Sequence, residues 1–214
     1  MPILKNINQA FFKTWSSEMA YLTGYIAADG AITIGPRGNS FLDLQSIDEE
    51  LIILAKTLFK ADHIISKRQR KDGVRYRLQI GSKTMVSDLS SLGLGPKKTK
   101  RMSLPEIPQD YFFDFIRGYM DGDGSITVSP QYVLLRFTTG SQLFLGDVDS
   151  KISEMLGIKG SLFYSGNAWR LNYSGKSAMK LLKSIYKQGY FCCLKRKYEK
   201  YREALNYHSE GPVV

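Results

Sequence analysis

The stretch that decides the fold occurs twice in the chain, as Leu22-Thr-Gly-Tyr-Ile-Ala-Ala-Asp-Gly30 and as Ile116-Arg-Gly-Tyr-Met-Asp-Gly-Asp-Gly124. The two copies align without a gap, and so do the residues that follow them. Such self-similarity indicates an internal duplication, so we expect two related halves. The identical positions are Gly24, Tyr25, Asp29, Gly30, Ile32, Thr33 and Pro36 in the first copy and Gly118, Tyr119, Asp123, Gly124, Ile126, Thr127 and Pro130 in the second.

Each copy also carries two small residues four positions apart. Gly24 and Ala28 share one face of a helix, and Gly118 and Gly122 share the corresponding face of the second helix. Small residues on one face let two helix backbones approach closely. We therefore expect the two helices to pack against each other through these faces.

The two copies end in the same way, with an Asp followed by a Gly. We expect Gly30 and Gly124 to stop the helices in the left-handed conformation that commonly follows a helix end. Asp29 and Asp123 would then meet at two helix C-termini, where the helix dipole is already negative. Two carboxylates so placed raise each other's pKa unless a divalent cation neutralises them. The duplication therefore predicts a metal site, although one Asp-Gly copy alone is typical of an ordinary turn.

The two stretches resemble the paired motifs of the LAGLIDADG homing endonucleases, in the form that carries both motifs on one chain. The resemblance covers nearly the whole chain, as a half-domain of residues 1–104 with the motif at 22–30 and a half-domain of residues 105–214 with the motif at 116–124. It implies an α+β fold of two pseudo-symmetric αββαββα halves, each with a four-stranded antiparallel sheet, packed through the motif helices. One difference is that the earlier acid of the motif is Asp121 in the second copy and Ala27 in the first.

The resemblance also implies a function, namely a monomeric, site-specific endonuclease that cuts double-stranded DNA across the minor groove of a long recognition site. The penultimate acid of the motif is the metal ligand of the family, which corresponds to Asp29 and Asp123 here. The backbone carbonyls of Ala28 and Gly122 complete the expected Mg²⁺ site. We expect Mn²⁺ to substitute for Mg²⁺, and Ca²⁺ to support DNA binding without cleavage.

A lysine points into the metal site in this family, and each half of the chain has a basic cluster near its end. Lys98 and Lys197 are the expected catalytic lysines, because a fixed cation there stabilises charge that develops during hydrolysis. Lys97 and Lys195 are the alternatives within the same clusters. Contact with phosphates, without a catalytic role, is the other interpretation of these lysines.

Polar and apolar residues alternate in several expected strands, as in Arg75, Arg77 and Gln79. Residues two apart lie on one face of a sheet, so a basic face backs onto an apolar one. Arg, Gln, Asn and Thr are the side chains that contact phosphates and base edges, although an ordinary solvated face is the alternative. The expected DNA-binding residues are Arg37, Gln45, Ser46, Lys67, Gln69, Arg75, Arg77, Gln79, Arg136, Thr138, Thr139, Arg170 and Asn172.

The hydrophobic pattern predicts the same order of elements in both halves. In the first half we expect helices over 17–29, 48–58 and 84–92 and strands over 31–34, 41–47, 64–70 and 74–80. In the second half we expect helices over 111–122, 141–156, 176–187 and 194–207 and strands over 125–128, 132–138, 161–164 and 168–173.

The composition fits this interpretation, with 43% hydrophobic residues and a net charge of +10. A basic chain of this kind is typical of nucleic-acid binders, so double-stranded DNA is the expected partner and intron RNA a further candidate. The two cysteines are adjacent, and no apolar run reaches the length of a membrane span. We therefore expect an intracellular, reducing location, either a prokaryotic cytoplasm or an organelle. An RNA maturase or a DNA-binding regulator on the same scaffold is the alternative function.

Overall fold

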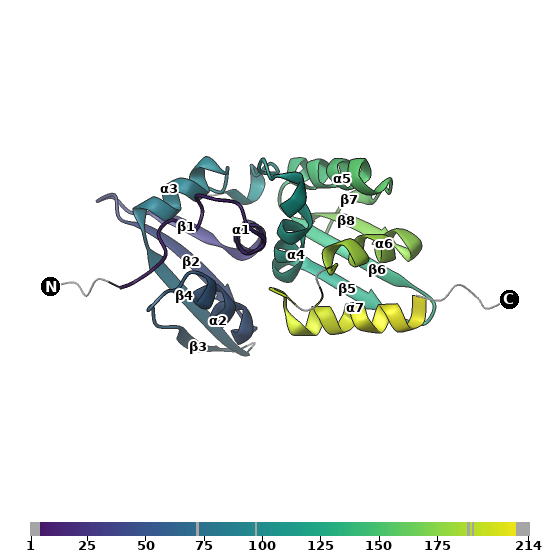
Figure 1. Cartoon of the computed structure of the whole chain (residues 1–214), viewed down its shortest axis with the longest axis horizontal. Helices are drawn as coiled ribbons and strands as arrows, with labels where there is room; N and C mark the ends of the chain where they lie inside the picture. The colour runs from purple at the N-terminus through teal and green to yellow at the C-terminus, as the bar shows by residue number, and fades with distance from the viewer. Residues whose placement is uncertain (1–4, 72, 97, 188, 190, 209–214) are drawn as a thin grey trace.

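The computed structural model describes residues 5–71, 73–96, 98–187, 189 and 191–208. Two halves lie side by side, each with a four-stranded antiparallel sheet and helices packed on one face of it (Figure 1). The strand order is β1-β2-β4-β3 in the first sheet and β5-β6-β8-β7 in the second, so the two sheets have the same topology. The expected α+β fold of two related αββαββα halves is confirmed.

The observed boundaries lie within two residues of those expected. The first half consists of α1 (Ser17–Asp29), β1 (Ala31–Ile34), β2 (Ser40–Ser46), α2 (Glu49–Leu58), β3 (Ser66–Arg70), β4 (Gly73–Gly81) and α3 (Lys83–Ser91), followed by the short 3-10 helices η1 (Lys98–Lys100) and η2 (Gln109–Tyr111). The second half consists of α4 (Phe112–Asp123), β5 (Gly124–Val128), β6 (Val133–Thr139), α5 (Gln142–Leu156), β7 (Ser161–Ser165), β8 (Ala168–Ser174), α6 (Gly175–Ile185) and α7 (Lys195–His208).

Serine side chains fix the start of three helices. The hydroxyl of Ser16 accepts a hydrogen bond from the backbone N–H of Met19 at 3.1 Å and so caps α1. Ser82 and Ser141 cap α3 and α5 in the same way. Such caps satisfy backbone donors that the first turn of a helix leaves unpaired, which explains why these boundaries are readable from the sequence.

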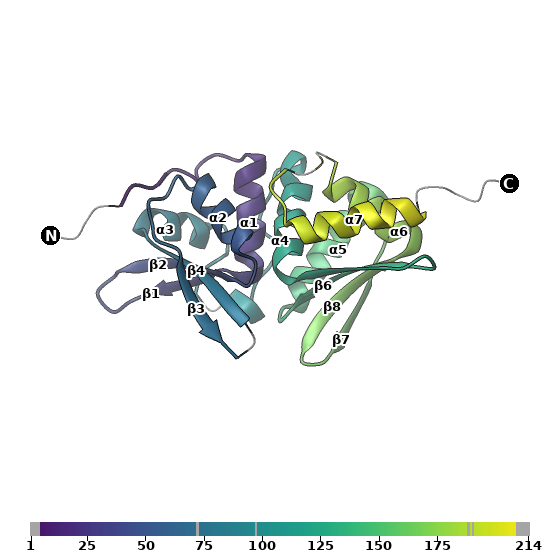
Figure 2. The same cartoon turned by 90° about the horizontal axis from the view of Figure 1, so that it is seen from below.

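The two motif helices, α1 and α4, pack together at the centre of the molecule (Figure 2). A Cβ atom at Gly24 would lie 2.0 Å from the backbone oxygen of Phe115, and one at Gly118 would lie 1.8 Å from that of Tyr21. The backbones therefore touch where any larger residue would collide. The predicted packing through small-residue faces is confirmed.

Gly30 and Gly124 correct one expectation, because neither adopts a left-handed conformation. Their φ angles are −74° and −100°, and the chain passes directly from each helix into an extended strand. The glycines are needed for space instead. A Cβ atom at Gly30 would lie 2.7 Å from the Cγ2 atom of Ile26, and one at Gly124 would lie 2.2 Å from the sulfur of Met120.

The helices cover one face of each sheet and leave the other face open, and together the two open faces form an arch (Figure 2). Leu78 and Ile80 of β4 are fully buried under the helices, whereas Arg75, Arg77 and Gln79 reach solvent. We call the uncovered sides of the two sheets the open faces. Within the described part of the chain, no helix is long and apolar enough to cross a bilayer.

The connector between the halves contacts the second half. The backbone N–H of Leu104 donates to the Asp147 carboxylate of α5 at 3.2 Å, and the hydroxyl of Ser141 donates to the carbonyl of Met102 at 2.6 Å. The division of the chain between residues 104 and 105 stays a prediction.

Candidate active site

The C-terminal ends of α1 and α4 bring Asp29 and Asp123 together between the two sheets. A Cβ atom at Gly122 of α4 would lie 3.3 Å from an Asp29 carboxylate oxygen, so the end of α4 borders the acid of α1, and the Asp29 carboxylate acts electrostatically on Asp123. Both carboxylates are open to solvent on one side and surrounded by protein on the others. The predicted meeting of the two acids is therefore present in the structure.

The electrostatics of this pair follow from partial burial and mutual repulsion. Burial and the neighbouring Asp29 carboxylate together raise the pKa of Asp123 to about 6, against the opposing charges of Lys197 and Lys98. Burial also raises the pKa of Asp29, against the charges of Lys197, Lys98 and Arg75. A cation between the two carboxylates would lower both pKa values, because a nearby opposite charge favours the ionised form.

Lys98 and Lys197 occupy corresponding places beside the two acids. The ammonium group of Lys98 donates to the carbonyl of Gly30, and that of Lys197 donates to the carbonyl of Gly124 at 2.8 Å. Gly30 and Gly124 are equivalent positions of the two motifs, so the two lysines make equivalent contacts in the two halves. Of the alternatives, Lys97 lies outside the described residues, and the Lys195 side chain is exposed and lies 3.9 Å from the Glu199 carboxylate.

The two lysines differ in burial. Lys197 is only 4% exposed, and it also donates to the carbonyls of Met120 and Asp121, the latter at 2.9 Å. Burial lowers the pKa of Lys197 to about 8, with Asp121 opposing this shift. Burial lowers the pKa of Lys98 as well, with Asp123 and Asp29 opposing it.

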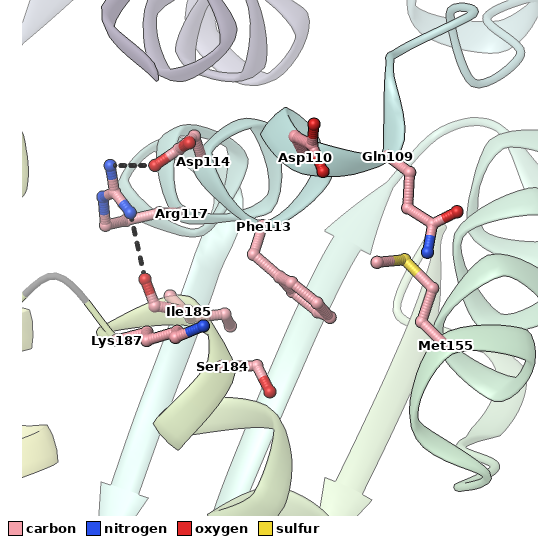
Figure 3. Close-up of a pocket in the computed structure, with 9 residues that line it drawn as sticks. All are labelled: Gln109, Asp110, Phe113, Asp114, Arg117, Met155, Ser184, Ile185 and Lys187. Atoms are coloured by element: carbon pink, nitrogen blue, oxygen red, sulfur yellow. Dashed lines mark hydrogen bonds and ion pairs between the residues drawn. The ribbon is translucent and has the colours of Figure 1, made fainter.

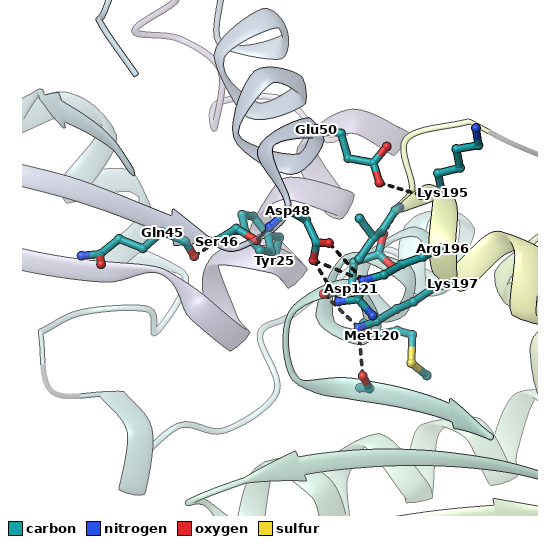
Figure 4. A network of polar contacts seen from close by, with 12 residues as sticks. Tyr25, Gln45, Ser46, Asp48, Glu50, Met120, Asp121, Lys195, Arg196 and Lys197 are labelled. Atoms are coloured by element: carbon teal, nitrogen blue, oxygen red, sulfur yellow. Dashed lines mark hydrogen bonds and ion pairs between the residues drawn. The ribbon is translucent and has the colours of Figure 1, made fainter. Parts of the chain in front are cut away.

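Asp121, the earlier acid of the second motif, is a buried anchor rather than a group open to solvent. It is 2% exposed and accepts hydrogen bonds from the hydroxyl of Tyr21 at 2.8 Å and the backbone N–H of Leu194 at 2.7 Å. Because Leu194 directly precedes α7, these bonds hold the start of the helix that carries Lys197 (Figure 4). The sequence singled out Asp121 but did not indicate these partners.

An ion pair joins the two halves next to this anchor. The guanidinium group of Arg196 lies 2.9 Å from the Asp48 carboxylate at the start of α2, and the N–H of Lys195 donates to Glu50 at 3.1 Å (Figure 4). Asp48 occupies the N-cap position of α2 without capping it through its side chain. Its carboxylate instead positions α7 across the boundary between the halves.

Most of the predicted DNA-binding residues lie on the open faces. The strand register places Gln45 opposite Arg77, Arg136 opposite Asn172, and Thr138 opposite Arg170, and partners of this kind share one face. Arg37 lies exposed between β1 and β2. The predicted residues on the open faces are Gln45, Arg75, Arg77, Gln79, Arg136, Thr138, Arg170 and Asn172.

The strand register corrects the prediction of which β3 residues lie on the open face. Arg68 pairs with Arg75, so Arg68 and Arg70 share the open face, whereas Lys67 and Gln69 point to the helix side. Lys67 accordingly lies 3.0 Å from the Glu49 carboxylate of α2. Which residues of a hairpin strand face one side of the sheet depends on the number of residues in the turn. The alternation within one strand does not determine that number.

Ser46 and Thr139 also lie apart from the open faces, at equivalent ends of β2 and β6. Ser46 accepts a hydrogen bond from the N–H of Asp48 at 3.0 Å. Thr139 is 7% exposed and accepts a hydrogen bond from the N–H of Ser141 at 3.3 Å. Both hydroxyls therefore support the chain turns into the following helices.

Asp43 is an acid on the open face that the sequence analysis missed. Its two carboxylate oxygens share the Nε–H of Arg77, at 2.9 and 2.7 Å, and also accept from Nη2 of Arg77 and, at 3.3 Å, from the amide of Gln45. The corresponding place in the second sheet holds Arg136, which donates to Asn172 at 2.9 Å. The two open faces therefore differ in charge at their centres.

A family model described as "LAGLIDADG-like domain" matches residues 16–93 and, separately, residues 110–186. The chain belongs to this family. No curated protein sequence gives a significant match. Both matched ranges contain one motif and one sheet, so the duplication read from the sequence is the duplication of this domain.

Solved structures with the same fold include LAGLIDADG endonucleases bound to DNA. The homing endonuclease I-WcaI bound to its DNA recognition sequence has a TM-score of 0.65 and 13% identity, over 90% of this chain and 91% of that one. I-DmoI in complex with DNA and Ca has a TM-score of 0.59 and 18% identity, over 84% and 91%. The N-terminal LAGLIDADG domain of DUF199/WhiA has a TM-score of 0.56 and 16% identity, over 90% and 93%.

The donor atoms of this LAGLIDADG protein fit a magnesium ion only if substrate shares in binding it. Among the described residues, no cluster of three or more His, Cys, Asp or Glu side chains is placed to hold a metal. Asp29 and Asp123 supply two carboxylates, and the carbonyls of Ala28 and Gly122 belong to helix ends, where backbone acceptors lack helical partners. Mg²⁺ is commonly bound by one or two carboxylates together with substrate phosphates, so this donor set fits.

Proposed function

We propose that this LAGLIDADG protein is a site-specific endonuclease that cuts both strands of DNA with the help of Mg²⁺. The observation that carries the proposal is the pairing of Asp29 and Asp123 between two arginine-bearing open faces. A catalytic centre between two nucleic-acid-binding surfaces is the arrangement that cleavage within a long site requires. The DNA-bound endonucleases of the same fold support this reading.

On this proposal the open faces hold the DNA. A two-stranded β-ribbon fits the major groove, so each sheet reads one half-site, and the acids lie over the minor groove between them. The half-domains of residues 1–104 and 105–214 each serve one half-site. Because both motifs lie on one chain, the protein acts as a monomer, and we expect sedimentation with DNA to give one chain per duplex.

The chemistry at the centre is hydrolysis of a phosphodiester bond on each strand. Asp29 and Asp123 would hold a divalent cation, which when bound would supply a nucleophile at neutral pH and stabilise the leaving oxygen. The chain's own groups do the rest. Lys98 and Lys197 each bind the carbonyl of a motif glycine and set a fixed positive charge beside one acid, where negative charge develops on the phosphate.

The test of this proposal begins with a library of randomised duplex sites, from which the protein selects its target in Ca²⁺. The selected site is placed in a plasmid, and Mg²⁺ is added. With Mg²⁺ we expect linear product with short 3′ overhangs. Cleavage should be slower in a buffer that contains no Mn²⁺ and is depleted of Mg²⁺. Selection of a site without any cleavage in Mg²⁺ or Mn²⁺ would favour the DNA-binding regulator on this scaffold instead.

Removing Arg77 tests the DNA face. Arg77→Ala should weaken binding to the selected site by about 1–3 kcal/mol and relax the preference at one base pair, because a bidentate arginine discriminates among bases. Asp43→Asn should have a similar effect on preference without the loss of a positive charge, since Asp43 orients Arg77. Fluorescence anisotropy on site variants measures both.

The salt dependence is the control for this prediction. Each neutralised phosphate contributes roughly −0.9 to the log–log slope, so Arg77→Ala changes the slope only if Arg77 contacts phosphate. An affinity of the unchanged protein that does not depend on salt would mean that the open faces do not carry the DNA.

The unequal burial of the two lysines gives a further prediction. Lys98→Met and Lys197→Met should both slow cleavage, and Lys197→Met should lower stability more than Lys98→Met, by about 1–3 kcal/mol for each further buried group left unsatisfied. The reason is that Lys197 satisfies three carbonyls at the end of α4, whereas Lys98 satisfies one. Urea unfolding and single-turnover cleavage separate the two effects, and equal losses of stability would contradict the assignment.

A further inference from the structure

The segment that carries Lys197 in the second half is held by two acids of the first half. The guanidinium group of Arg196, the residue before Lys197, donates through Nε and Nη2 to the Asp48 carboxylate, at 2.9 to 3.3 Å (Figure 4). The backbone N–H of Lys195 donates to the Glu50 carboxylate at 3.1 Å. A carboxylate that accepts two different donors of one guanidinium group fixes the orientation of that group as well as its distance.

Asp48 holds this segment from a fixed point of the first sheet. Its backbone N–H donates to the hydroxyl of Ser46 at 3.0 Å, and Ser46 is the last residue of β2, a strand that is paired on both sides. The ion pair of Asp48 with Arg196 is partly exposed, and such pairs contribute little to the stability of a fold. Its main consequence is therefore where it places the start of α7.

The chain between α6 and α7 has another anchor within its own half. Arg117 of α4 is buried, and it donates to the carbonyls of Ile185 and Cys192, each at 3.0 Å. Its charge is balanced by the Asp114 carboxylate at 2.6 Å (Figure 3). These contacts fix the chain as far as Cys192. Lys197 lies further along, in the first turn of α7, so its position depends on the contacts made by the residues next to it.

The corresponding contact on the side of Lys98 is weaker. Ser141 occupies the place of Asp48, at the N-cap of the helix that follows the second strand of its sheet. Its hydroxyl donates to the carbonyl of Met102, in the segment that follows Lys98, at 2.6 Å. Each half thus holds the segment next to the lysine of the other half. A single neutral hydrogen bond stands here in place of a bidentate ion pair, and charged hydrogen bonds are the stronger kind.

We propose that Asp48 is a positioning residue for Lys197, so that the first half, through Arg196, places the ammonium group of the lysine of the second half. The inference rests on the proposed endonuclease, in which Lys197 sets a fixed charge beside the reacting phosphate. Lys197 reaches its three carbonyls only while the first turn of α7 lies against the end of α4. Loss of Asp48 lets this turn shift, and a displacement of about 1 Å can cost on the order of a hundredfold in rate.

The test measures single-turnover cleavage of the selected site in Mg²⁺. Asp48→Asn should cut about tenfold more slowly, with its DNA affinity in Ca²⁺ unchanged, and Asp48→Glu should recover most of the rate because it keeps a carboxylate. The deciding comparison uses the lysine variants as backgrounds. Asp48→Asn should cost about tenfold again in Lys98→Met but nothing further in Lys197→Met, where no lysine is left to position. A merely structural role of Asp48 would slow cleavage equally in all backgrounds.

Asp88→Asn is the matched control for Asp48→Asn. Asp88 of α3 also belongs to the first half, and it pairs with Lys13 at 2.5 Å. The side chains of Lys13 and Asp88 are 55% and 13% exposed, close to the 54% and 19% of Arg196 and Asp48. The control therefore removes an ion pair of similar exposure that lies on α3, away from α7 (Figure 1). Asp88→Asn should cut DNA at the rate of the unchanged protein.

A second measurement needs neither cleavage nor a lysine variant. The N–H of Lys197 donates to the carbonyl of Leu194 at 3.0 Å in the first turn of α7. In Asp48→Asn the amides of Lys195 and Lys197 should exchange hydrogen about tenfold faster, because local opening of this turn becomes easier, and in Asp88→Asn they should not.

The two measurements separate the proposals. If the unchanged protein cuts no DNA, the proposed function fails, and hydrogen exchange still decides whether Asp48 holds the segment of Lys197. Unchanged exchange in Asp48→Asn, or an equal further loss of cleavage in the Lys98→Met and Lys197→Met backgrounds, would overturn the role of Asp48 and leave the proposed function standing.

Discussion

Replacing either motif acid, as Asp29→Asn or Asp123→Asn, should reduce DNA cleavage by about three orders of magnitude while the fold and DNA affinity persist. The amide keeps the shape of the side chain but removes the charge that holds a divalent cation. Such a cation contributes several kcal/mol to hydrolysis, and each 1.36 kcal/mol corresponds to about tenfold in rate. Plasmid cleavage in Mg²⁺ gives the rate, and a gel shift in Ca²⁺ gives the affinity.

The same variants have a second effect that does not depend on activity. An acid whose pKa is raised in the folded state binds protons more tightly than in the unfolded chain, so stability falls as pH rises through the interval between the two pKa values. For Asp123 this interval runs from 3.8 to about 6. In metal-free buffer, Asp29→Asn should make this fall smaller: burial still raises the pKa of Asp123, but the second cause, the Asp29 carboxylate, is removed, and so is the contribution of the raised pKa of Asp29 itself.

The number of strands cut tells whether the two acids act as one unit. If they do, the double variant is no less active than either single variant; if each acid serves one strand, the single variants nick the plasmid. Asp62→Asn, which changes an exposed acid outside the site, is the matched control and should cut normally. Wild-type rates for both motif variants would show that these acids only end helices, and the proposed enzyme would be abandoned.

The packing at the centre of the molecule could be predicted from the sequence, because the residues that determine it lie close together along the chain. Gly24 and Gly118 with their spaced small neighbours predicted the helix pair, and the following Asp predicted where the two acids meet. Lys98 and Lys197 were chosen because the family resemblance implies a lysine at the metal site, and the duplication puts them at corresponding places. Each of these features depends on spacing along one helix or on the duplication, and both are visible in a single chain.

The features that were missed depend on contacts between distant segments. Arg196 pairs with Asp48 across the two halves, and Asp121 accepts a hydrogen bond from the N–H of Leu194. Because the partners lie far apart in the sequence, no local pattern predicts either contact. The turn before β4 determines which residues of β3 face the open side, and for this reason Arg68, and not Lys67, lies on the open face. Asp43 was missed for a similar reason, because an acid between two leucines has the pattern of an ordinary strand residue.

The glycines show how one residue type serves different purposes. The sequence suggested a left-handed turn for Gly30, yet its φ angle of −74° is open to any residue. What excludes a side chain there is Ile26 of its own helix. Backbone conformation and crowding both select glycine, and only the packed structure separates them.

Gly118→Ala should lower the free energy of unfolding by at least about 3 kcal/mol, and crowding is again the reason. The added Cβ atom would lie 1.8 Å from the backbone oxygen of Tyr21, and neither helix has a flexible side chain there that can move aside. Overpacking in a rigid contact forces the helices apart, and that would expose the central core and separate Asp29 from Asp123. Urea unfolding followed by circular dichroism measures the loss.

The chain supplies a matched control for this substitution in Gly146, inside α5. A Cβ atom at Gly146 would meet nothing within 4 Å, so Gly146→Ala should stabilise the protein by about 0.5–1 kcal/mol through helix propensity alone. The same chemical change thus has opposite signs in two helices. Gly24→Ala, 2.0 Å from the oxygen of Phe115, repeats the test from the other helix. If Gly118→Ala and Gly24→Ala unfold at the urea concentration of the unchanged protein, the two motif helices do not meet backbone to backbone, and the acids at their ends lose the geometry on which the proposed cleavage depends.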